Sequence, residues 1–257
     1  MEDKLKAFER LLNIMDELRE KCPWDREQTF ESLRANTLEE AYELAGSILS
    51  KDYNEMRKEL GDLLLHIVFY SKIASEENRF TIAEVMNGLC DKLIYRHPHV
   101  FGDVSVSGTV EVLENWEQLK IKEKDGNKTV LSGVPKALPA LIKANRIQEK
   151  VRAVGFDWEE RDQVWDKVEE EYQELRKEVT ENNMANAEKE FGDLLFSVVN
   201  AARLYGIDPE SALEKTNQKF MKRFGYLEER TIKTGKNLKE MSLDEMNVIW
   251  EESKQFD

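Results

Sequence analysis

Two acidic stretches decide the fold: EEAYEL at residues 39–44 and ELGDLL at residues 59–64. The same pair returns as EEYQEL at residues 170–175 and EFGDLL at residues 190–195. In both copies the third glutamate and the aspartate lie 19 residues apart, and the copies are separated by 131 residues. The repeating units of a solenoid are far shorter than this, so we interpret the pattern as the internal duplication of a whole domain.

The residues around these stretches are typical of helices. Charged residues make up 35% of the 257-residue chain, which has only five prolines and twelve glycines. Apolar and charged residues alternate at helical spacing, as at Leu5, Phe8 and Leu12. No period-two alternation is long enough to predict a sheet. The sequence therefore predicts an all-α fold of tandem duplicated helical bundles.

The predicted organisation has two domains, at residues 1–123 and 136–257, joined by a polar, turn-rich linker at residues 124–135. One helix is expected to begin near Thr37, because Thr37 and Glu40 have the spacing of a capping box. The helices expected in the first domain span about 4–20, 37–50, 52–77, 81–96 and 110–124. Those expected in the second span about 136–152, 163–180, 184–205 and 208–231, with a last one after Ser242.

The bulk composition excludes several classes of partner. The net charge of −14 argues against binding to nucleic acid or to an anionic membrane surface. Cys22 and Cys90 lie far apart in no metal-ligand spacing, which favours a reducing compartment. No apolar run is long enough to span a bilayer, and the N-terminus lacks a signal-peptide pattern. We expect a cytoplasmic protein that needs local positive charge or bound metal to hold an anionic substrate.

The acids have the spacing of a metal site. Residues three or four apart share a helix face, so two antiparallel helices joined near residues 50–52 would bring four carboxylates together. In the first copy these are Glu40, Glu43, Glu59 and Asp62, and in the second Glu171, Glu174, Glu190 and Asp193. Buried without counterions they would repel one another, and hard oxygen ligands favour Mg²⁺, or Mn²⁺, over zinc. The sequence predicts a divalent-cation site in each copy.

The residues around the acids disfavour two other interpretations, a solvated helix face and a di-iron bundle. A merely solvated face is disfavoured because the acids adjoin apolar residues and because a glycine recurs among them, at Gly61 and Gly192. Glycine costs about 1 kcal/mol inside a helix, so its recurrence predicts a close helix approach or ligand access there. A di-iron bundle needs Glu-x-x-His on two helices. The second half contains no histidine, which excludes that site there.

Basic residues recur at matched positions as well. Lys92 and Arg96 in the first half match Lys219 and Arg223 in the second, each pair at i and i+4. Such a pair could hold phosphate oxygens, or it could be an ordinary surface pair on an acidic protein. The segment His97-Pro98-His99 occurs only in the first half, and we predict a structural turn there rather than a metal site.

Tryptophans recur near the end of each half, at Trp116 and Trp250. Their rings could stack on a nucleotide base, or they could anchor a core or an interface. Both alternatives stay open at this level.

Specific blocks of sequence carry a family resemblance. The blocks are CPWDREQT (22–29), LEEAYE (38–43), ELGDLL (59–64), RHPHVF (96–101), VGFDW (154–158), EEYQEL (170–175), EFGDLLF (190–196) and KFMKRF (219–224). Over essentially its whole length the chain resembles the two-domain MazG nucleoside triphosphate pyrophosphohydrolases, of the all-α NTP pyrophosphohydrolase superfamily. The resemblance implies Mg²⁺-dependent cleavage of NTPs, including ATP, and often of dNTPs, to the monophosphate and pyrophosphate. It also implies a homodimer in which helices of two protomers complete each bundle.

The resemblance also implies roles for single residues. The catalytic, metal-binding carboxylates would be Glu171, Glu174, Glu190 and Asp193, and the further metal ligands Glu40, Glu43, Glu59 and Asp62. The substrate-binding residues would be Lys219, Arg223 and Trp250, with Lys92 and Arg96 as first-half counterparts. The second half lacks the CPWD and RHPHVF blocks, so we expect the halves to differ in function. Because Lys219, Arg223 and Trp250 accompany the second set of acids, the second half is slightly favoured as the main catalytic unit, although the first half has counterparts to all three. The alternative is a regulatory module that binds nucleotides with little turnover in one or both halves.

Overall fold

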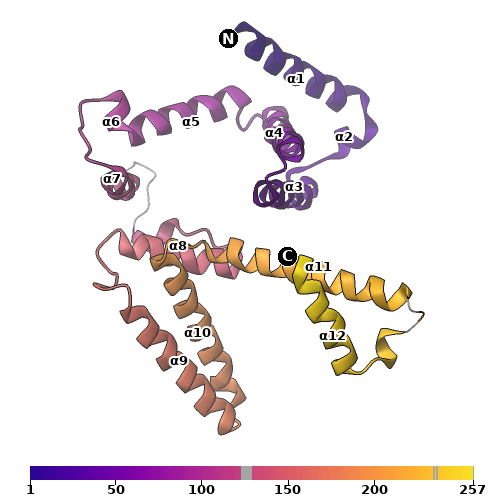
Figure 1. Cartoon of the computed structure of the whole chain (residues 1–257). Helices are drawn as coiled ribbons and strands as arrows, with labels where there is room; N and C mark the ends of the chain where they lie inside the picture. Colours follow the sequence, from indigo (N-terminus) through magenta and orange to yellow (C-terminus); the bar gives the residue numbers. More distant parts are fainter. Residues whose placement is uncertain (123–128, 234, 236, 257) are drawn as a thin grey trace. The chain divides into compact units, whose positions relative to one another are not determined.

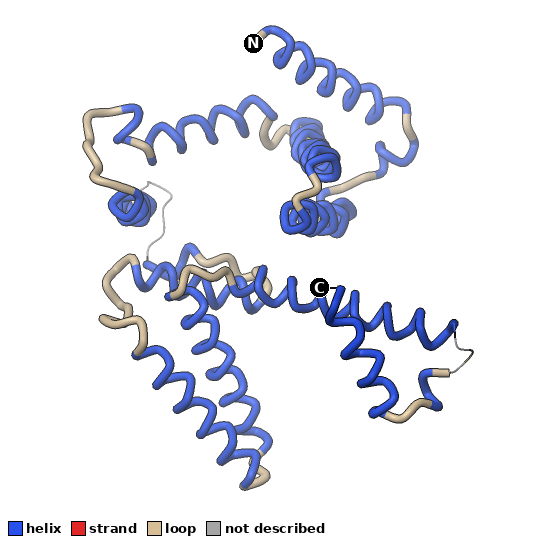
Figure 2. Tube along the Cα trace, in the orientation of Figure 1, coloured by secondary structure: helices blue, strands red, loops and turns tan. Residues whose placement is uncertain are grey.

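The computed structural model describes residues 1–122, 129–233, 235 and 237–256, and among these it contains helices and no strand (Figure 2). The chain forms two compact units, residues 1–107 and 108–257, which are described separately below. The first five residues of the expected linker, 124–128, lie outside the described residues. The all-α class and the tandem helical units are as predicted, whereas the domain boundaries at 123 and 136 stay a prediction.

The first unit is built around one helical hairpin. Its helices are α1 (Glu2–Lys21), α2 (Pro23–Glu27), α3 (Phe30–Ser50), α4 (Tyr53–Glu76), α5 (Ile82–Arg96) and α6 (Pro98–Phe101) (Figure 1). Helices α3 and α4 pack along each other, and the turn between them passes through Lys51 in the left-handed conformation (φ 58°). Asp52 caps α4 by accepting the N–H groups of Asn54 and Glu55, each at 3.0 Å. The sequence predicted this hairpin and this cap.

Helix α3 begins at Phe30, so the predicted start near Thr37 is wrong. Thr29 is the N-cap: its hydroxyl accepts the Ser32 N–H at 3.2 Å, and the Ser32 hydroxyl accepts the Thr29 N–H at 2.9 Å. Thr37 lies inside the helix and donates its hydroxyl to the Leu33 carbonyl at 2.9 Å. A threonine can make this bond in a helix interior, so its spacing from a glutamate does not identify a cap.

The core of the first unit lies where α1 crosses the hairpin. Its buried apolar residues come from α1, α3 and α4, and they are Met15, Leu33, Val68, Phe69 and Ile73. Because α1 packs on α4, these side chains fix the face that α4 presents to α3. The acids of α3 and α4 are therefore carried on two helices that the core holds in register.

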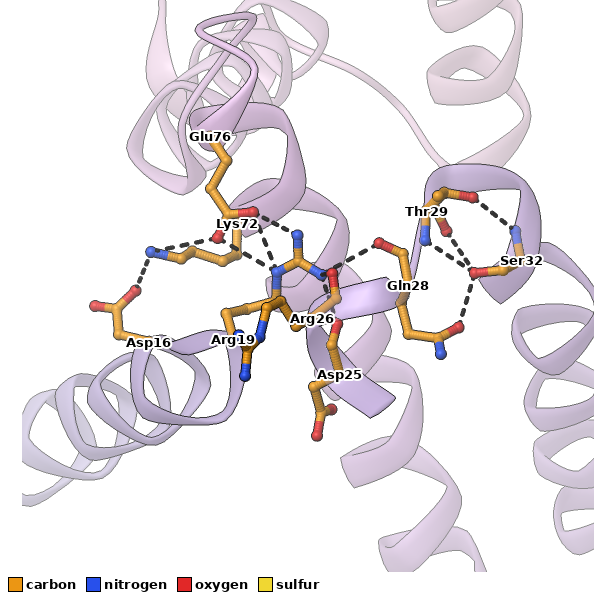
Figure 3. Close-up of polar contacts among 9 residues, drawn as sticks. All are labelled: Asp16, Arg19, Asp25, Arg26, Gln28, Thr29, Ser32, Lys72 and Glu76. Atoms are coloured by element: carbon orange, nitrogen blue, oxygen red, sulfur yellow. Dashed lines mark hydrogen bonds and ion pairs between the residues drawn. The ribbon is translucent and has the colours of Figure 1, made fainter. Parts of the chain in front are cut away.

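Arg19 ties the CPWD segment to this core (Figure 3). Its guanidinium donates to the backbone carbonyls of Asp25, Arg26 and Gln28 at 2.5, 3.1 and 3.2 Å. It also pairs with the Glu76 carboxylate of α4 at 2.5 Å. The last carbonyls of a short helix have no partner within the helix, and a cation placed there satisfies them. Arg19 thus ends α2 and holds it near the end of α4.

The second unit repeats the hairpin. It contains α7 (Thr109–Lys122), α8 (Ala140–Arg152), α9 (Gln163–Thr180), α10 (Met184–Leu204), α11 (Pro209–Lys233) and α12 (Leu243–Ser253), with 3₁₀ turns at Val130–Gly133, Leu238–Glu240 and Lys254–Phe256. Helices α9 and α10 lie side by side, α8 packs on α10 and α11, and α12 folds back on α11 (Figure 1). Helix α8 begins four residues later than predicted, because a residue preceding a proline, here Leu138 before Pro139, disfavours helical conformation.

A tight turn ends α8 and places the next segment against α10. Gly155 adopts φ 86°, and the Phe156 N–H donates to the Val151 carbonyl at 3.0 Å, which is the Schellman arrangement. The chain then reaches Asp157, which pairs with Arg203 of α10 at 2.5 Å. The VGFDW block therefore ends α8, and its ion pair with Arg203 holds the following segment against α10, which carries part of the second set of acids.

None of the helices in the described part of the chain is long and apolar enough to cross a membrane.

Candidate metal-binding and catalytic site

The first acidic group lies between α3 and α4. Glu40 and Glu43 of α3 and Glu59 of α4 each offer a carboxylate oxygen, and these oxygens lie within 4.8 Å of one another. Glu59 is only 4% exposed, and its Oε2 accepts no hydrogen bond from any described residue. Asp62, the fourth predicted ligand, lies one turn further along α4 and is not part of this group.

The nearby cation Lys58 forms its described ion pair with Glu55, which is not one of these three acids. Burial, followed by a hydrogen bond with Glu55 and the charge of Glu43, raises the pKa of Glu59 to about 7. A buried carboxylate oxygen without a partner is costly. A divalent cation held by these oxygens would supply both the missing partner and the missing charge, so this donor set fits a hard cation.

The second acidic group has the same construction. Glu171 and Glu174 of α9 and Glu190 of α10 offer oxygens within 4.8 Å of one another, and Glu171 is buried. Burial, followed by the charges of Glu174 and Asp193, raises the pKa of Glu190. Asp193 is not one of the three clustered acids, but its charge acts on Glu190. The structure thus brings three of the four predicted ligands together in each unit.

A lysine distinguishes the second group from the first. Lys167 Nζ lies 2.7 Å from Glu171 Oε1 and 3.0 Å from Glu170 Oε1. Its hydrogen bonds to these carboxylates raise the pKa of Lys167 above its ordinary value. Asn36 occupies the matching position of the first unit. Lys167 was not among the predicted site residues, although its place four residues before Glu171 on one helix was a usable signal.

A cavity of about 620 Å³ adjoins the second group. Both Glu171 and Asp193 line it, and so do the aromatic side chains of Phe156, Trp158 and Phe196. Its walls come from α8, the segment after α8, α9 and α10. This cavity was not predicted, because its lining residues come from segments that are far apart in the sequence.

The basic and aromatic candidates of the second unit gather on α11 and α12. The Arg223 guanidinium carbon lies 5.7 Å from the centre of the Trp250 ring, and the ring centres of Trp250 and Phe220 are 5.0 Å apart. Among the described residues that line the cavity, Lys219, Arg223 and Trp250 are absent. Their described ring and cation–π contacts are with one another and with Phe220, on α11 and α12.

The first-half counterparts lie on other helices. Lys92 and Arg96 belong to α5, which buries none of its residues, and Trp116 belongs to α7 of the second unit. The segment after Arg96 forms the short helix α6, and His97 Nδ1 lies 2.6 Å from the Leu93 carbonyl. His97 and His99 join none of the acidic groups found in the described residues.

Comparisons with known proteins place these units in a family. The model of the MazG nucleotide pyrophosphohydrolase domain matches residues 28–101 and 160–226, the segments that carry the two acidic groups. The chain is 44% identical to the nucleoside triphosphate pyrophosphohydrolase/pyrophosphatase MazG of Thermotoga maritima, over 96% of this chain and 95% of that protein. It is 42% identical to the nucleoside triphosphate pyrophosphohydrolase of Escherichia coli K12, over 97% of this chain and 98% of that protein. It is 45% identical to the uncharacterized protein YabN of Bacillus subtilis, over 96% of this chain and 52% of that protein. A family match to both acidic hairpins and identity along nearly the whole length show that this chain belongs to the MazG family of nucleotide pyrophosphohydrolases.

Proposed function

We propose that this chain hydrolyses nucleoside and deoxynucleoside triphosphates to the monophosphate and pyrophosphate, with Mg²⁺ as its cofactor. The observation that carries the proposal is the grouping of Glu171, Glu174 and Glu190 beside a cavity of ligand size. Relatives of nearly equal length are named for this activity. Four carboxylates alone would repel a triphosphate, so an anionic substrate requires a cation at this place.

The carboxylates of the second unit, Glu171, Glu174, Glu190 and Asp193, would hold the cation, and Glu40, Glu43, Glu59 and Asp62 would do so in the first. Bound there, Mg²⁺ neutralises phosphate charge and lowers the pKa of a water molecule, and Mn²⁺ could replace it. Lys167 adds positive charge at the acidic group from the same chain. The carboxylates would fix where the phosphates lie through the cation, and the cavity walls would surround the rest of the substrate.

We further infer that two copies of the chain associate. Helix α5 buries no residue of its own, and large apolar side chains such as Leu89 and Leu93 are nearly half exposed. On α11, Phe220 and Met221 are more than half exposed. Contiguous apolar faces of this kind are typical of interfaces. A second copy covering them could bring its own Lys219, Arg223 and Trp250 to the acidic group.

The test is a product analysis by anion exchange with ATP, dATP and the other common triphosphates, in Mg²⁺ and in EDTA. We expect monophosphate and pyrophosphate in Mg²⁺ only. Asp193→Asn should lower the rate about a hundredfold or more, the usual size for losing a group that organises transition-state charge, without lowering the thermal unfolding temperature. Asp166→Asn, an exposed aspartate on the same helix as Glu171, is the matched control and should retain activity.

Two outcomes would contradict this function. Diphosphate and inorganic phosphate as products would mean a different hydrolase. Nucleotide that binds in Mg²⁺ but is never cleaved would favour the alternative, a regulatory module with little turnover.

A further inference from the structure

A histidine buried between α3 and α4 of the first unit has one ring nitrogen without a partner. His66 of α4 is 7% exposed, and its Nδ1 lies 3.1 Å from the Thr37 hydroxyl of α3. No described residue forms a hydrogen bond with its Nε2. This nitrogen is not one of the unpaired side-chain atoms that are closed to solvent, so a small group or an ion can reach it.

The hydrogen bonds of Thr37 determine which nitrogen of His66 carries the proton. The Thr37 hydroxyl has one proton and donates it to the Leu33 carbonyl at 2.9 Å, because a carbonyl can only accept. The two other groups bonded to this oxygen must then donate to it, Tyr70 through its hydroxyl at 2.7 Å and His66 through Nδ1–H. In the neutral ring Nε2 therefore has the lone pair, which can bind a metal ion.

Neighbouring rings hold His66 in this orientation. Tyr70 stacks on Phe30 of α3, with ring centres 6.0 Å apart, and its ring centre lies 6.2 Å from that of His66. A histidine that binds a metal through one nitrogen almost always donates the other N–H to an oxygen, which fixes the tautomer and orients the ring. Because His66 donates to Thr37 in this way, its ring is already oriented for a ligand at Nε2.

Asp62 is the carboxylate that the helix brings next to His66. Residues four apart share a helix face, and helical side chains lean toward the N-terminal end of their helix, so His66 leans toward Asp62. Asp62 is half-buried, and no hydrogen bond or ion pair ties its carboxylate to a described residue. Neither Asp62 nor His66 belongs to the group formed by Glu40, Glu43 and Glu59. The two residues are thus a separate pair of metal-binding groups beside that group.

The second unit has different residues at the matching positions. Asp193 matches Asp62, but Val168, Ser197 and Ala201 stand where the first unit has Thr37, His66 and Tyr70. The histidine and the two hydroxyl groups around it are therefore replaced together. Helices α9 and α10 pack along each other without them, so the hairpin does not need a buried histidine in order to form.

We propose that His66 Nε2 and the Asp62 carboxylate bind a divalent transition-metal ion in the first unit, beside the first acidic group. An imidazole nitrogen suits Zn²⁺ or Ni²⁺, whereas Mg²⁺ takes oxygen ligands. Water would complete the coordination shell. The two units would then select different ions, because the second has a serine where the first has its nitrogen ligand. This site does not depend on nucleotide hydrolysis.

The direct test is nuclear magnetic resonance of the histidine rings in the full chain, which has three histidines. The ¹⁵N-labelled protein is first freed of metal with a chelator and then kept in excess Mg²⁺, so that sites made of oxygen ligands are occupied. At a pH where the His66 ring is neutral, we expect its proton on Nδ1. Adding Zn²⁺ should move the Nε2 resonance of His66, because the ion takes its lone pair, whereas Mg²⁺ alone should leave it in place.

Substitutions test the same site through Zn²⁺ affinity, measured by calorimetry in excess Mg²⁺. Thr37→Val removes the orienting hydroxyl and should weaken the binding of one Zn²⁺ by about tenfold, the smaller effect usual for a group that orients a ligand. His66→Gln removes the ligand itself and should weaken it by about a hundredfold or more. In Thr37→Val the proton of the neutral ring should also no longer be confined to Nδ1. His99→Gln removes a histidine outside the site and is the control, which should keep the affinity.

A Zn²⁺-dependent shift of Nε2, with a loss of affinity confined to Thr37→Val and His66→Gln, supports the site. A proton on Nε2 in the metal-free protein overturns it, and so does a His66 resonance that Zn²⁺ leaves in place. Both of these results come from the unaltered protein, so they hold even if His66→Gln does not fold. A loss of affinity in His99→Gln alone would assign the ion to that histidine and also overturns the proposal. A lack of pyrophosphate release would contradict the proposed hydrolysis and leave this site unaffected, so the two failures are distinguishable.

Discussion

In the first acidic group, the unfavourable free energy of burying a carboxylate among other acids falls mainly on Glu59. Burial and neighbouring acids raise its pKa from 4.5 to about 7. In the folded, metal-free protein it therefore binds a proton more tightly than in the unfolded chain. Folding takes up a proton between about pH 4.5 and 7, so the stabilising contribution is fully present below pH 4.5 and is lost as the pH rises through 7.

This predicts how Glu59→Gln changes the pH dependence of stability. In EDTA, the difference in unfolding temperature between the variant and the unaltered protein should grow in favour of the variant from pH 5 to pH 8, because the amide does not ionise. Thermal unfolding followed by circular dichroism at several pH values measures it. Glu39→Gln, an exposed neighbour on α3, should show no such trend. A difference that stays constant with pH would contradict the raised pKa.

At this scale the sequence predicted which glutamates come together, because helical spacing alone puts Glu40 beside Glu43 and Glu171 beside Glu174. It did not predict how buried each acid is, nor that the aspartates lie outside the groups of three. The burial of Gln148 was not predicted either, because its amide nitrogen donates to the Phe196 carbonyl, 48 residues away. Spacing within one helix is local information, whereas burial and partners depend on how helices pack.

At the scale of elements, the glycines inside helices have a different role from the glycine that ends a helix. Gly61 and Gly192 recur inside helices, and a close approach of another helix was one predicted reason. A Cβ built on either glycine would meet no described atom within 4 Å, so no helix of the same unit approaches closely there. Ligand access and the approach of a second copy of the chain remain as reasons for their recurrence. Gly155 is different, since its φ of 86° is needed for the turn that ends α8.

Substituting alanine at Gly192 and at Gly155 should have opposite effects on stability. Gly192→Ala should raise the free energy of unfolding by about 1 kcal/mol, the usual gain inside a helix. Gly155→Ala should lower it by about 1 kcal/mol or more, because alanine is strained at positive φ. Urea unfolding measures both, and kcat/KM for ATP should fall in Gly192→Ala if a ligand needs the space. A destabilised Gly192→Ala, with a loss that depends on protein concentration, would instead show that a second copy approaches α10.

Both units of the molecule contain the same helical hairpin, but the residues packed around the hairpin differ between them. The sequence predicted the duplication because the acids keep their spacing, and both hairpins are present. It could not predict that one copy places amides and a cavity beside its acids, because these depend on residues from four segments. Because the acids are duplicated but their surroundings differ, we propose that both units bind a cation and that the second unit carries nucleotide turnover.

This difference predicts unequal effects of the same substitution at matched positions. Glu174→Gln should lower ATP hydrolysis by the full chain about a hundredfold or more, whereas Glu43→Gln, 131 residues earlier, should leave the rate within about threefold, the size of a modest indirect effect. The reason is that a cavity of about 620 Å³, large enough for a ligand, adjoins the second acidic group. Both substitutions should weaken Mn²⁺ binding measured by calorimetry, one site in each variant. Equal losses of activity would mean that both units turn over nucleotide, and a larger loss in Glu43→Gln would assign the reaction to the first.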